Sequence, residues 1–358
     1  MGYPRIEIYP GRIEENARRV VNECARWGIA VIGVTKGACG HPAVAGAMLR
    51  GGVSMLADSR LVNLAGLRRA GITTELMLIR LPSPSELDEL VSLADHSLNS
   101  EPEVIRAIGE RAAAIGRMHR VTLMVDVGER REGLMPERVR SVCRQIASFK
   151  GVRLEALGTN VACLSGVLPT RENVQVLVDL AAGVGRELGF PVGVSGGNTA
   201  TTILMESGEM PAGVTHLRIG EAILNGTDTS NQRVVPGTRS DTFRLVAEVI
   251  EVQHKPSRPE GPTGVDAFGL KPAFVDRGVR VRAIAAVGKQ DVEIGGLKPC
   301  DPGVSIIGAS SDHLILDVTD AAAPVRPGGF VEFWVQYPAM LRLMTSEYVE
   351  KAVISRSP

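Results

Sequence analysis

The stretch Ala30-Val31-Ile32-Gly33-Val34-Thr35-Lys36 is a short apolar run that ends on a lysine, and Gly37-Ala38-Cys39-Gly40-His41-Pro42 follows it at once. An apolar run bounded by glycines and a proline is typical of a buried strand, although a buried piece of helix gives the same pattern. In a parallel barrel or sheet, ligand sites form at the carboxyl ends of the strands. Lys36 is therefore a candidate nucleophilic amine or base, whereas many lysines at strand ends simply face water.

Strand-like and helix-like segments alternate with short connections on both sides of this stretch. The predicted strands are 30–34, 53–57, 76–79, 96–98, 121–126, 154–158, 192–195 and 216–219. About eight strands separated by helices indicate a parallel (β/α)8 barrel, and a doubly wound open sheet would give the same alternation. We favour the barrel because polar, glycine-rich turns follow one strand after another, and no GxGxxG motif follows the first strand.

The pattern changes after Gly226. Residues 231–237 have the composition of a linker, and strand-like runs separated by Pro, Gly and Asp turns follow at 243–250, 279–287, 304–308, 314–318 and 329–334. Helix signals are nearly absent from this part of the chain. We therefore predict an α/β protein with a (β/α)8 TIM-like barrel at residues 1–230 and a mainly β domain at residues 231–358.

Composition narrows the class of protein. The 358 residues are 44% hydrophobic and include 40 basic and 40 acidic side chains, which is an ordinary globular composition with no basic field for nucleic acid or a membrane surface. The beginning of the chain has no apolar leader region, and no run of about 18 apolar residues occurs, so we expect a cytoplasmic protein. The five cysteines lack CxxC spacing, which predicts neither a disulfide framework nor a metal site.

Two glycine turns follow late strands of the predicted barrel. The first, Ser195-Gly196-Gly197-Asn198-Thr199, stands at a strand-to-helix junction, where unpaired backbone N–H groups favour a phosphate group. The second, Leu217-Arg218-Ile219-Gly220-Glu221, adds an arginine on the strand. Either turn alone is compatible with a simple glycine turn. Together with Lys36 on the first strand, they indicate a barrel that binds pyridoxal phosphate.

Several longer motifs carry a resemblance to a known family. They lie at residues 34–36, 57–60, 125–133, 194–199, 217–226, 264–269, 308–313 and 345–348. With these motifs, essentially the whole chain resembles the fold-type III pyridoxal-phosphate enzymes related to alanine racemase, and within them it is especially similar to the ornithine racemase group.

The resemblance implies a role for individual residues. Lys36 would hold the cofactor covalently and return as an acid or base on one face of the substrate. Arg218 would face the pyridine nitrogen and keep it unprotonated, which makes the ring a weaker electron sink. Arg131 would lie beside the cofactor phenolate and the substrate carboxylate. The residues implied at the phosphate are Asn198, Thr199, Tyr348 and the backbone N–H groups of Gly220 and Glu221.

The chain also departs from the alanine racemases. They have a tyrosine in the loop after the lysine, where this chain has residues 38–41 without a tyrosine, and a lysine where this chain has Met124. Their second catalytic base is a tyrosine of the partner subunit, and the corresponding residue here is Phe268. Phenylalanine exchanges no proton, so we predict Asp266, two residues earlier, as the second acid or base; a simple turn aspartate is the alternative.

The resemblance implies an amino-acid racemase that acts on ornithine or another basic amino acid. Asp312 corresponds to a substrate-side aspartate of the family, and a carboxylate there suits the terminal ammonium of such a substrate. The implied assembly is a head-to-tail homodimer in which each β domain completes the other barrel's site. Two alternatives stay open: a decarboxylase or aldolase of the same fold, and a pyridoxal-phosphate binding and homeostasis protein without turnover, against which the β domain argues.

Overall fold

The computed structural model describes residues 2–271 and 273–355 and divides into two compact units. One unit is Pro10–Arg239, and the other combines Met1–Tyr9 with Ser240–Pro358. The barrel unit thus extends nine residues beyond the boundary that we expected at residue 230. The reason is that the expected linker packs into it: the Val235 N–H donates to the Gly226 carbonyl oxygen at 2.9 Å, and the Arg233 Nε donates to Asp228 at 3.0 Å.

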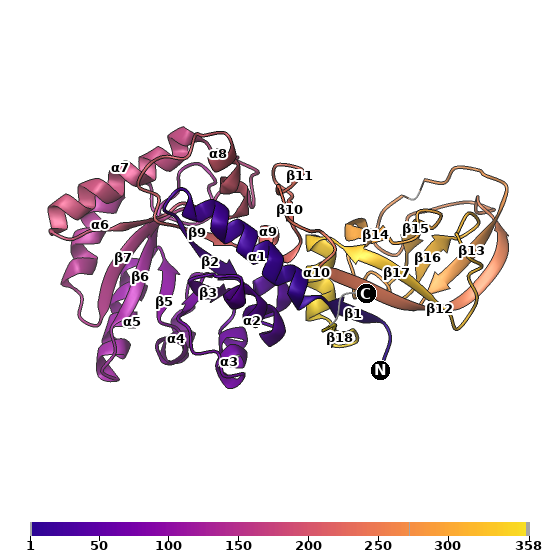
Figure 1. The fold of residues 1–358 in the computed structure, drawn as a ribbon, viewed down its shortest axis with the longest axis horizontal. Coiled ribbons are helices and arrows are strands. Elements are labelled where there is room, and N and C mark those ends of the chain that lie inside the picture. The colour runs from indigo at the N-terminus through magenta and orange to yellow at the C-terminus, as the bar shows by residue number, and fades with distance from the viewer. Residues whose placement is uncertain (1, 272, 356–358) are drawn as a thin grey trace. The chain divides into compact units, whose positions relative to one another are not determined.

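Eight parallel strands close into a barrel in the unit Pro10–Arg239, which confirms the predicted fold class. The strands follow in chain order: β2 (Ala30–Val34), β3 (Met55–Asp58), β4 (Leu76–Leu78), β5 (His96–Asn99), β6 (His119–Met124), β7 (Val152–Gly158), β8 (Gly193–Ser195) and β9 (His216–Ile219). Helices cover the outside of these strands (Figure 1). They are α1 (Pro10–Ala25), α2 (Pro42–Arg50), α3 (Leu61–Arg69), α4 (Leu87–Leu93), α5 (Pro102–Ala114), α6 (Pro136–Ser148), α7 (Arg171–Leu188), α8 (Ile203–Glu206) and α9 (Glu221–Leu224).

Local sequence signals explain where these helices begin and end. In α2, Pro42 occupies the first turn and the preceding His41 accepts a hydrogen bond from the Ala43 N–H through Nδ1 at 3.3 Å. In α7, Thr170 and Asn173 form a reciprocal capping box, and Gly189 ends the helix with a left-handed φ of 76°. These signals fix where the loops before α2 and α7 end.

The barrel interior is apolar along one side and polar along another. A cluster of buried side chains comes from five consecutive strands: Ile32, Val34, Met55, Ala57, Met77, Leu98 and Met124. The strand register pairs Ile32 of β2 with Arg218 of β9. Paired residues of neighbouring parallel strands point to the same face, so Arg218 also points into the barrel.

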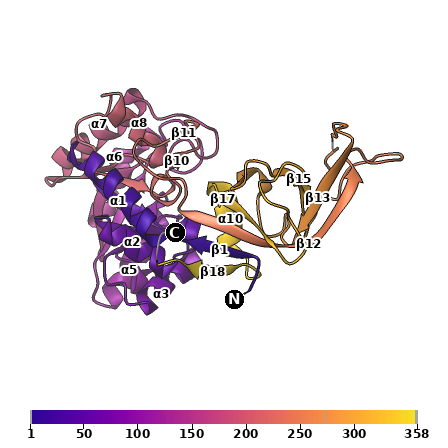
Figure 2. The ribbon, with the colours of Figure 1, turned by 45° about the vertical axis from the view of Figure 1, so that its right-hand side comes forward.

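The second unit is mainly β, as predicted, and its main sheet is antiparallel. Its main path is β14 (Leu297–Pro299), β17 (Phe330–Val335), β12 (Phe243–Pro256), β13 (Val279–Ala285), β16 (Leu314–Asp317) and β15 (Ser305–Ala309). The long strands β12 and β13 run side by side in the middle of this path (Figure 2). Two further strands, β1 (Arg5–Ile8) and β18 (Glu350–Val353), pair with each other, and β1 also pairs with β12. A small ladder of β10 (Thr227–Asp228) and β11 (Arg233–Val234) belongs to the barrel unit.

The β unit contains a helix, although we found nearly no helix signals in its sequence. Helix α10 (Tyr337–Thr345) has a proline in its first turn and buries Ala339, Met340, Leu343 and Met344. Proline is favoured in the first turn of a helix, so Pro338 was an available signal for the start of α10. The helix precedes the segment that carries Tyr348.

Candidate functional site

The carboxyl ends of β2, β8 and β9 carry Lys36 and the two glycine turns. Lys36 follows β2 directly and begins a single turn of 3-10 helix, η1 (Lys36–Ala38), where its side chain is exposed. Strand β2 lies between β3 and β9 in the closed barrel. Lys36 therefore stands at the barrel mouth beside the turn that follows Arg218.

A buried carboxylate fixes the backbone that carries Lys36. Thr35 donates from N to the Ala57 carbonyl oxygen at 2.8 Å and from Oγ1 to Asp58 Oδ2 at 2.7 Å. The other oxygen of Asp58 accepts from Asn63 Nδ2 at 2.8 Å. Burial raises the pKa of Asp58, and these hydrogen bonds oppose that shift. Asp58 therefore acts as a positioning residue for Lys36.

Arg218 is buried in the barrel and ties two neighbouring strand ends together. Its Nη2 donates to the carbonyl oxygen of Thr159, just after β7, at 2.5 Å, and its Nη1 donates to the Ser195 hydroxyl at the end of β8. Burial lowers the pKa of Arg218 to about 10, which the nearby Glu132 partly opposes. In residues 2–271 and 273–355 no carboxylate forms an ion pair with Arg218, so this cation is held mainly by neutral oxygens.

The first glycine turn has the geometry of an anion-binding turn. Asn198 caps η3 (Thr199–Thr202) by accepting from the Ala200 N–H at 2.8 Å, and its Nδ2 donates to the Val161 carbonyl oxygen at 2.8 Å. Gly197 has a φ of 121°, and a Cβ there would lie 2.4 Å from Thr201 Oγ1. Within the described part of the chain, the backbone N–H groups of Gly197, Asn198 and Thr199 have no acceptor. Such a row of free N–H groups favours a phosphate.

The second glycine turn lies against the first. The Thr199 hydroxyl oxygen accepts from the Ala222 N–H at 3.3 Å, which brings η3 and the start of α9 together. The carboxylate of Glu221 accepts from the Thr227 hydroxyl at 2.7 Å and from the Thr229 N–H at 2.9 Å. Burial raises the pKa of Glu221. The Glu221 side chain thus braces the turn at 227–229, and the role of its backbone N–H at the phosphate stays a prediction.

Arg131 lies on the loop after β6 and pairs with its neighbour. Its Nη2 donates to Glu132 Oε1 at 2.5 Å, and this carboxylate raises the pKa of Arg131. Hydrogen bonding to its charged form keeps Arg131 ionised at the barrel mouth.

Glu129 holds the next loop in place, a role that sequence reasoning missed. Its carboxylate accepts from the backbone N–H groups of Ala162 at 3.1 Å, Cys163 at 3.0 Å and Ser165 at 2.9 Å, and also from that of Leu164. Burial alone would raise the pKa of Glu129, but these N–H groups lower it. The available signal was the DVGERREG motif, in which a second acidic residue follows the strand.

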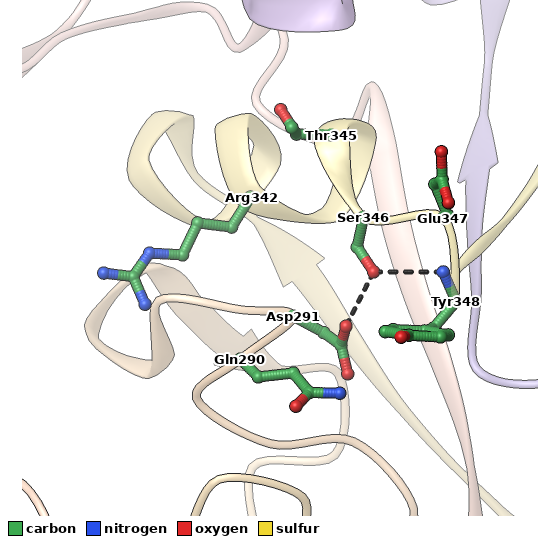
Figure 3. A pocket seen from close by; sticks show the side chains of 7 residues that line it. All are labelled: Gln290, Asp291, Arg342, Thr345, Ser346, Glu347 and Tyr348. Atoms are coloured by element: carbon green, nitrogen blue, oxygen red, sulfur yellow. Dashed lines mark hydrogen bonds between the residues drawn. The ribbon is translucent and has the colours of Figure 1, made fainter.

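The remaining predicted residues belong to the β unit. The Tyr348 side chain is 74% exposed, and its N–H donates to Ser346 Oγ at 3.2 Å. That hydroxyl donates to Asp291 Oδ1 at 2.6 Å, so a buried carboxylate sets the backbone of Tyr348 (Figure 3). Gln290 and Arg342 line the same cavity of about 370 Å³. Asp312 is exposed on the loop between β15 and β16.

Asp266 lies in a turn, and not in the extended segment that would place it on one strand face with Phe268. Its Oδ1 accepts from the N–H groups of Phe268 and Leu270, both at 2.9 Å. Its Oδ2 lies 3.4 Å from the Lys289 ammonium. The hydrogen bond from Leu270 is the main reason that the pKa of Asp266 is lowered. The structure thus has the turn aspartate that we kept as the alternative, and its role in catalysis stays a prediction.

Comparisons with known proteins show what the chain is similar to. The family model described as "Alanine racemase, N-terminal domain" matches residues 8–228. The chain is 43% identical to the lysine racemase of Thermotoga maritima over 98% of both chains. It is 37% identical to the ornithine racemase of Acetoanaerobium sticklandii over 98% of this chain and all of that one. The solved alanine racemase of Streptomyces lavendulae is 18% identical and matches the fold with a TM-score of 0.75 over 100% of this chain and 99% of that one.

No helix in the described ranges is both long and apolar enough to cross a membrane.

Proposed function

Because this chain belongs to the family defined by the alanine racemase N-terminal domain, we propose that it is a pyridoxal-phosphate-dependent racemase of a basic amino acid, lysine or ornithine. The observation that carries the proposal is the joint placement of Lys36, Arg218 and two anion-binding turns at one barrel mouth. The lysine and ornithine racemases named above support the choice of substrate class.

The residues at the mouth fit this cofactor. Lys36 supplies an exposed amine for covalent attachment, and the free N–H groups of residues 197–199 supply a cradle for its phosphate. Arg218, held between Thr159 and Ser195, would face the ring nitrogen. When bound, the cofactor supplies an electron-withdrawing ring that makes the α-proton of the substrate acidic.

The chain's own residues would then move the proton. Arg131 binds the substrate carboxylate, and Lys36 removes or returns the proton on one face of the α-carbon. Because racemisation requires a proton from the opposite face as well, a second ionisable group must lie there. Asp312 and Tyr348, from the β unit, are proposed to contact the substrate's terminal ammonium and the phosphate, respectively.

Exposed apolar side chains in the β unit support a homodimer. Val265, Leu270 and Val275 are 67%, 62% and 71% exposed, and they lie on the same segment as Phe268. Burying such side chains against another chain is favourable. We propose a head-to-tail homodimer in which this segment of one copy covers the barrel mouth of the other.

The decisive experiment follows the α-proton and the configuration together. Purified protein loaded with pyridoxal phosphate is incubated in deuterated water with L-ornithine, L-lysine, L-alanine or L-serine, and the products are examined by NMR and chiral chromatography. We expect deuterium incorporation and D-isomer formation with lysine or ornithine. Cofactor absorbance without exchange on any amino acid would contradict the racemase function and support a binding protein, whereas release of carbon dioxide would support a decarboxylase.

Gly197→Ala is expected to weaken cofactor retention by at least about tenfold, because a Cβ would meet Thr201 Oγ1 at 2.4 Å and disturb the free N–H groups. Gly208→Ala is the matched control: Gly208 also has a positive φ, 75°, but a Cβ there would contact nothing within 4 Å. Both variants place an alanine at a positive φ, so a difference in cofactor affinity between them is due to the turn at Gly197. Equal cofactor affinity of the two variants, measured by absorbance titration, would place the phosphate elsewhere.

A further inference from the structure

Lys289 contacts Phe268, the residue that corresponds to the second catalytic base of the alanine racemases. Its ammonium lies 4.0 Å from the centroid of the Phe268 ring and 3.4 Å from Asp266 Oδ2. The Lys289 side chain is 20% exposed, so it is well packed but still reachable. Phe268 itself exchanges no proton, which leaves Lys289 as the ionisable group in contact with its ring.

The backbone around Lys289 is held on both sides. The Lys289 N–H donates to the Ser310 carbonyl oxygen at 2.9 Å, and the Lys289 carbonyl oxygen accepts from Arg342 Nη1 at 2.8 Å. A Cβ at the preceding Gly288 would lie 2.2 Å from the Ser311 carbonyl oxygen, so the two loops are in close contact. The direction of the Lys289 side chain is therefore fixed by its surroundings, as acid–base catalysis requires.

Asp266 has the contacts of a counter-ion. One of its oxygens is taken by two backbone N–H groups, and the other faces Lys289. The pKa of Asp266 is lowered, which makes it a weaker base than an ordinary aspartate. The same carboxylate, together with the face of the Phe268 ring, holds the Lys289 ammonium in place.

We propose that Lys289 is the acid and base on the substrate face opposite Lys36, with Asp266 and Phe268 as positioning residues. This role rests on the proposed racemase function and on a second copy that brings its β unit to the barrel. In one direction the Lys36 amine takes the proton, which breaks the Cα–H bond and leaves the electron pair on the substrate. The Lys289 ammonium then gives its proton to the opposite face, which forms the new Cα–H bond. In the other direction the two lysines exchange roles.

Three substitutions of Lys289 separate proton transfer from structure. Lys289→Arg keeps the positive charge beside Asp266 and Phe268, but a guanidinium stays protonated and accepts no proton. Lys289→Met removes the charge and keeps the length. Lys289→Cys followed by aminoethylation restores an amine of nearly the same length. The α-proton exchange of each pure enantiomer in deuterated water is measured separately, together with racemisation and apoprotein melting.

We expect all three unmodified variants to racemise at least about 100-fold more slowly and to melt like the wild type. One enantiomer should still exchange its α-proton, because Lys36 works on its face, and the other should not. Aminoethylation of the Lys289→Cys variant should restore racemisation. An active Lys289→Arg variant, or equal loss of exchange from both enantiomers, would overturn the role of Lys289.

Substitutions of the neighbours complete the test. Asp266→Asn and Phe268→Leu should each slow racemisation by only about 3- to 30-fold, since they position Lys289 and transfer no proton. If the Asp266→Asn variant exchanges the α-proton of one enantiomer only and the Lys289→Met variant exchanges both, Asp266 is the base and the proposal is wrong. His313→Asn is the control on the neighbouring loop, and this variant should exchange the α-protons of both enantiomers as the wild type does. A wild-type protein that exchanges no amino acid would overturn the racemase function itself.

Discussion

Replacing Lys36 with alanine is expected to lower racemisation by at least about 10,000-fold, because one side chain serves as the cofactor's covalent attachment and as a base. The fold should be unaffected. Lys36 is exposed, and the packing of its backbone rests on Thr35 and Asp58, which the substitution leaves in place. We therefore expect the melting temperature of the apoprotein to change by no more than about 2 °C.

Two measurements check this expectation. Borohydride reduction of the loaded wild type followed by peptide mass spectrometry should place the cofactor on Lys36, and the variant should carry no such adduct. Lys36→Arg is the matched control, because it keeps the charge and length but offers no nucleophilic amine. A cofactor adduct on another lysine, or racemisation by Lys36→Ala above one-hundredth of wild type, would contradict the assignment.

The barrel was predictable because its signals are local. The segments 30–34 and 216–219 were predicted as strands and are β2 and β9 with the same bounds. The first is an apolar run and the second alternates polar with apolar residues, and neither pattern needs knowledge of the neighbouring strands. Strand β1 (Arg5–Ile8) was not predicted, because its partners β12 and β18 lie more than 200 residues away in the chain. Only the folded chain shows that pairing.

The site residues also divide into those with a local sequence signal and those whose role depends on distant partners. Lys36, Arg218 and the two glycine turns each follow a strand, so their common location followed from the fold class. Asp58 was missed as a positioning residue because its role depends on the strand register that sets Val34 beside Ala57. Glu129 was missed because its partners lie on the loop after the next strand.

The Asp266 segment shows where the sequence left two interpretations open. An aspartate three residues before Gly269 is a turn signal, since its side chain accepts from the following backbone N–H groups. The other interpretation, an extended segment that places Asp266 on one strand face with Phe268, is not what the structure has. The contact between Phe268 and Lys289 joins residues about 20 positions apart, and nothing in the sequence indicates it.

Arg218→Met is expected to slow racemisation by roughly 100- to 1000-fold and to leave the apoprotein nearly as stable as the wild type. Methionine fills similar volume but donates no hydrogen bond to a ring nitrogen. Two effects on stability oppose each other. The variant loses the hydrogen bonds to Thr159 and Ser195, which costs about 3 kcal/mol if those oxygens stay buried and unpaired. The variant also removes a buried positive charge, and burying that charge is unfavourable for folding.

Burial lowers the pKa of Arg218 to about 10, so the charged form is less favourable inside the folded protein than in water. The loss of the hydrogen bonds and the removal of this cation therefore act on stability in opposite directions, and we expect the melting temperature to change by less than about 5 °C. Ser195→Ala is the control, because it removes one acceptor and keeps the cation; its rate should fall by less than about tenfold. If Arg218→Met melts more than about 10 °C lower while its folded fraction racemises normally, Arg218 joins the strand ends and takes no part in the reaction.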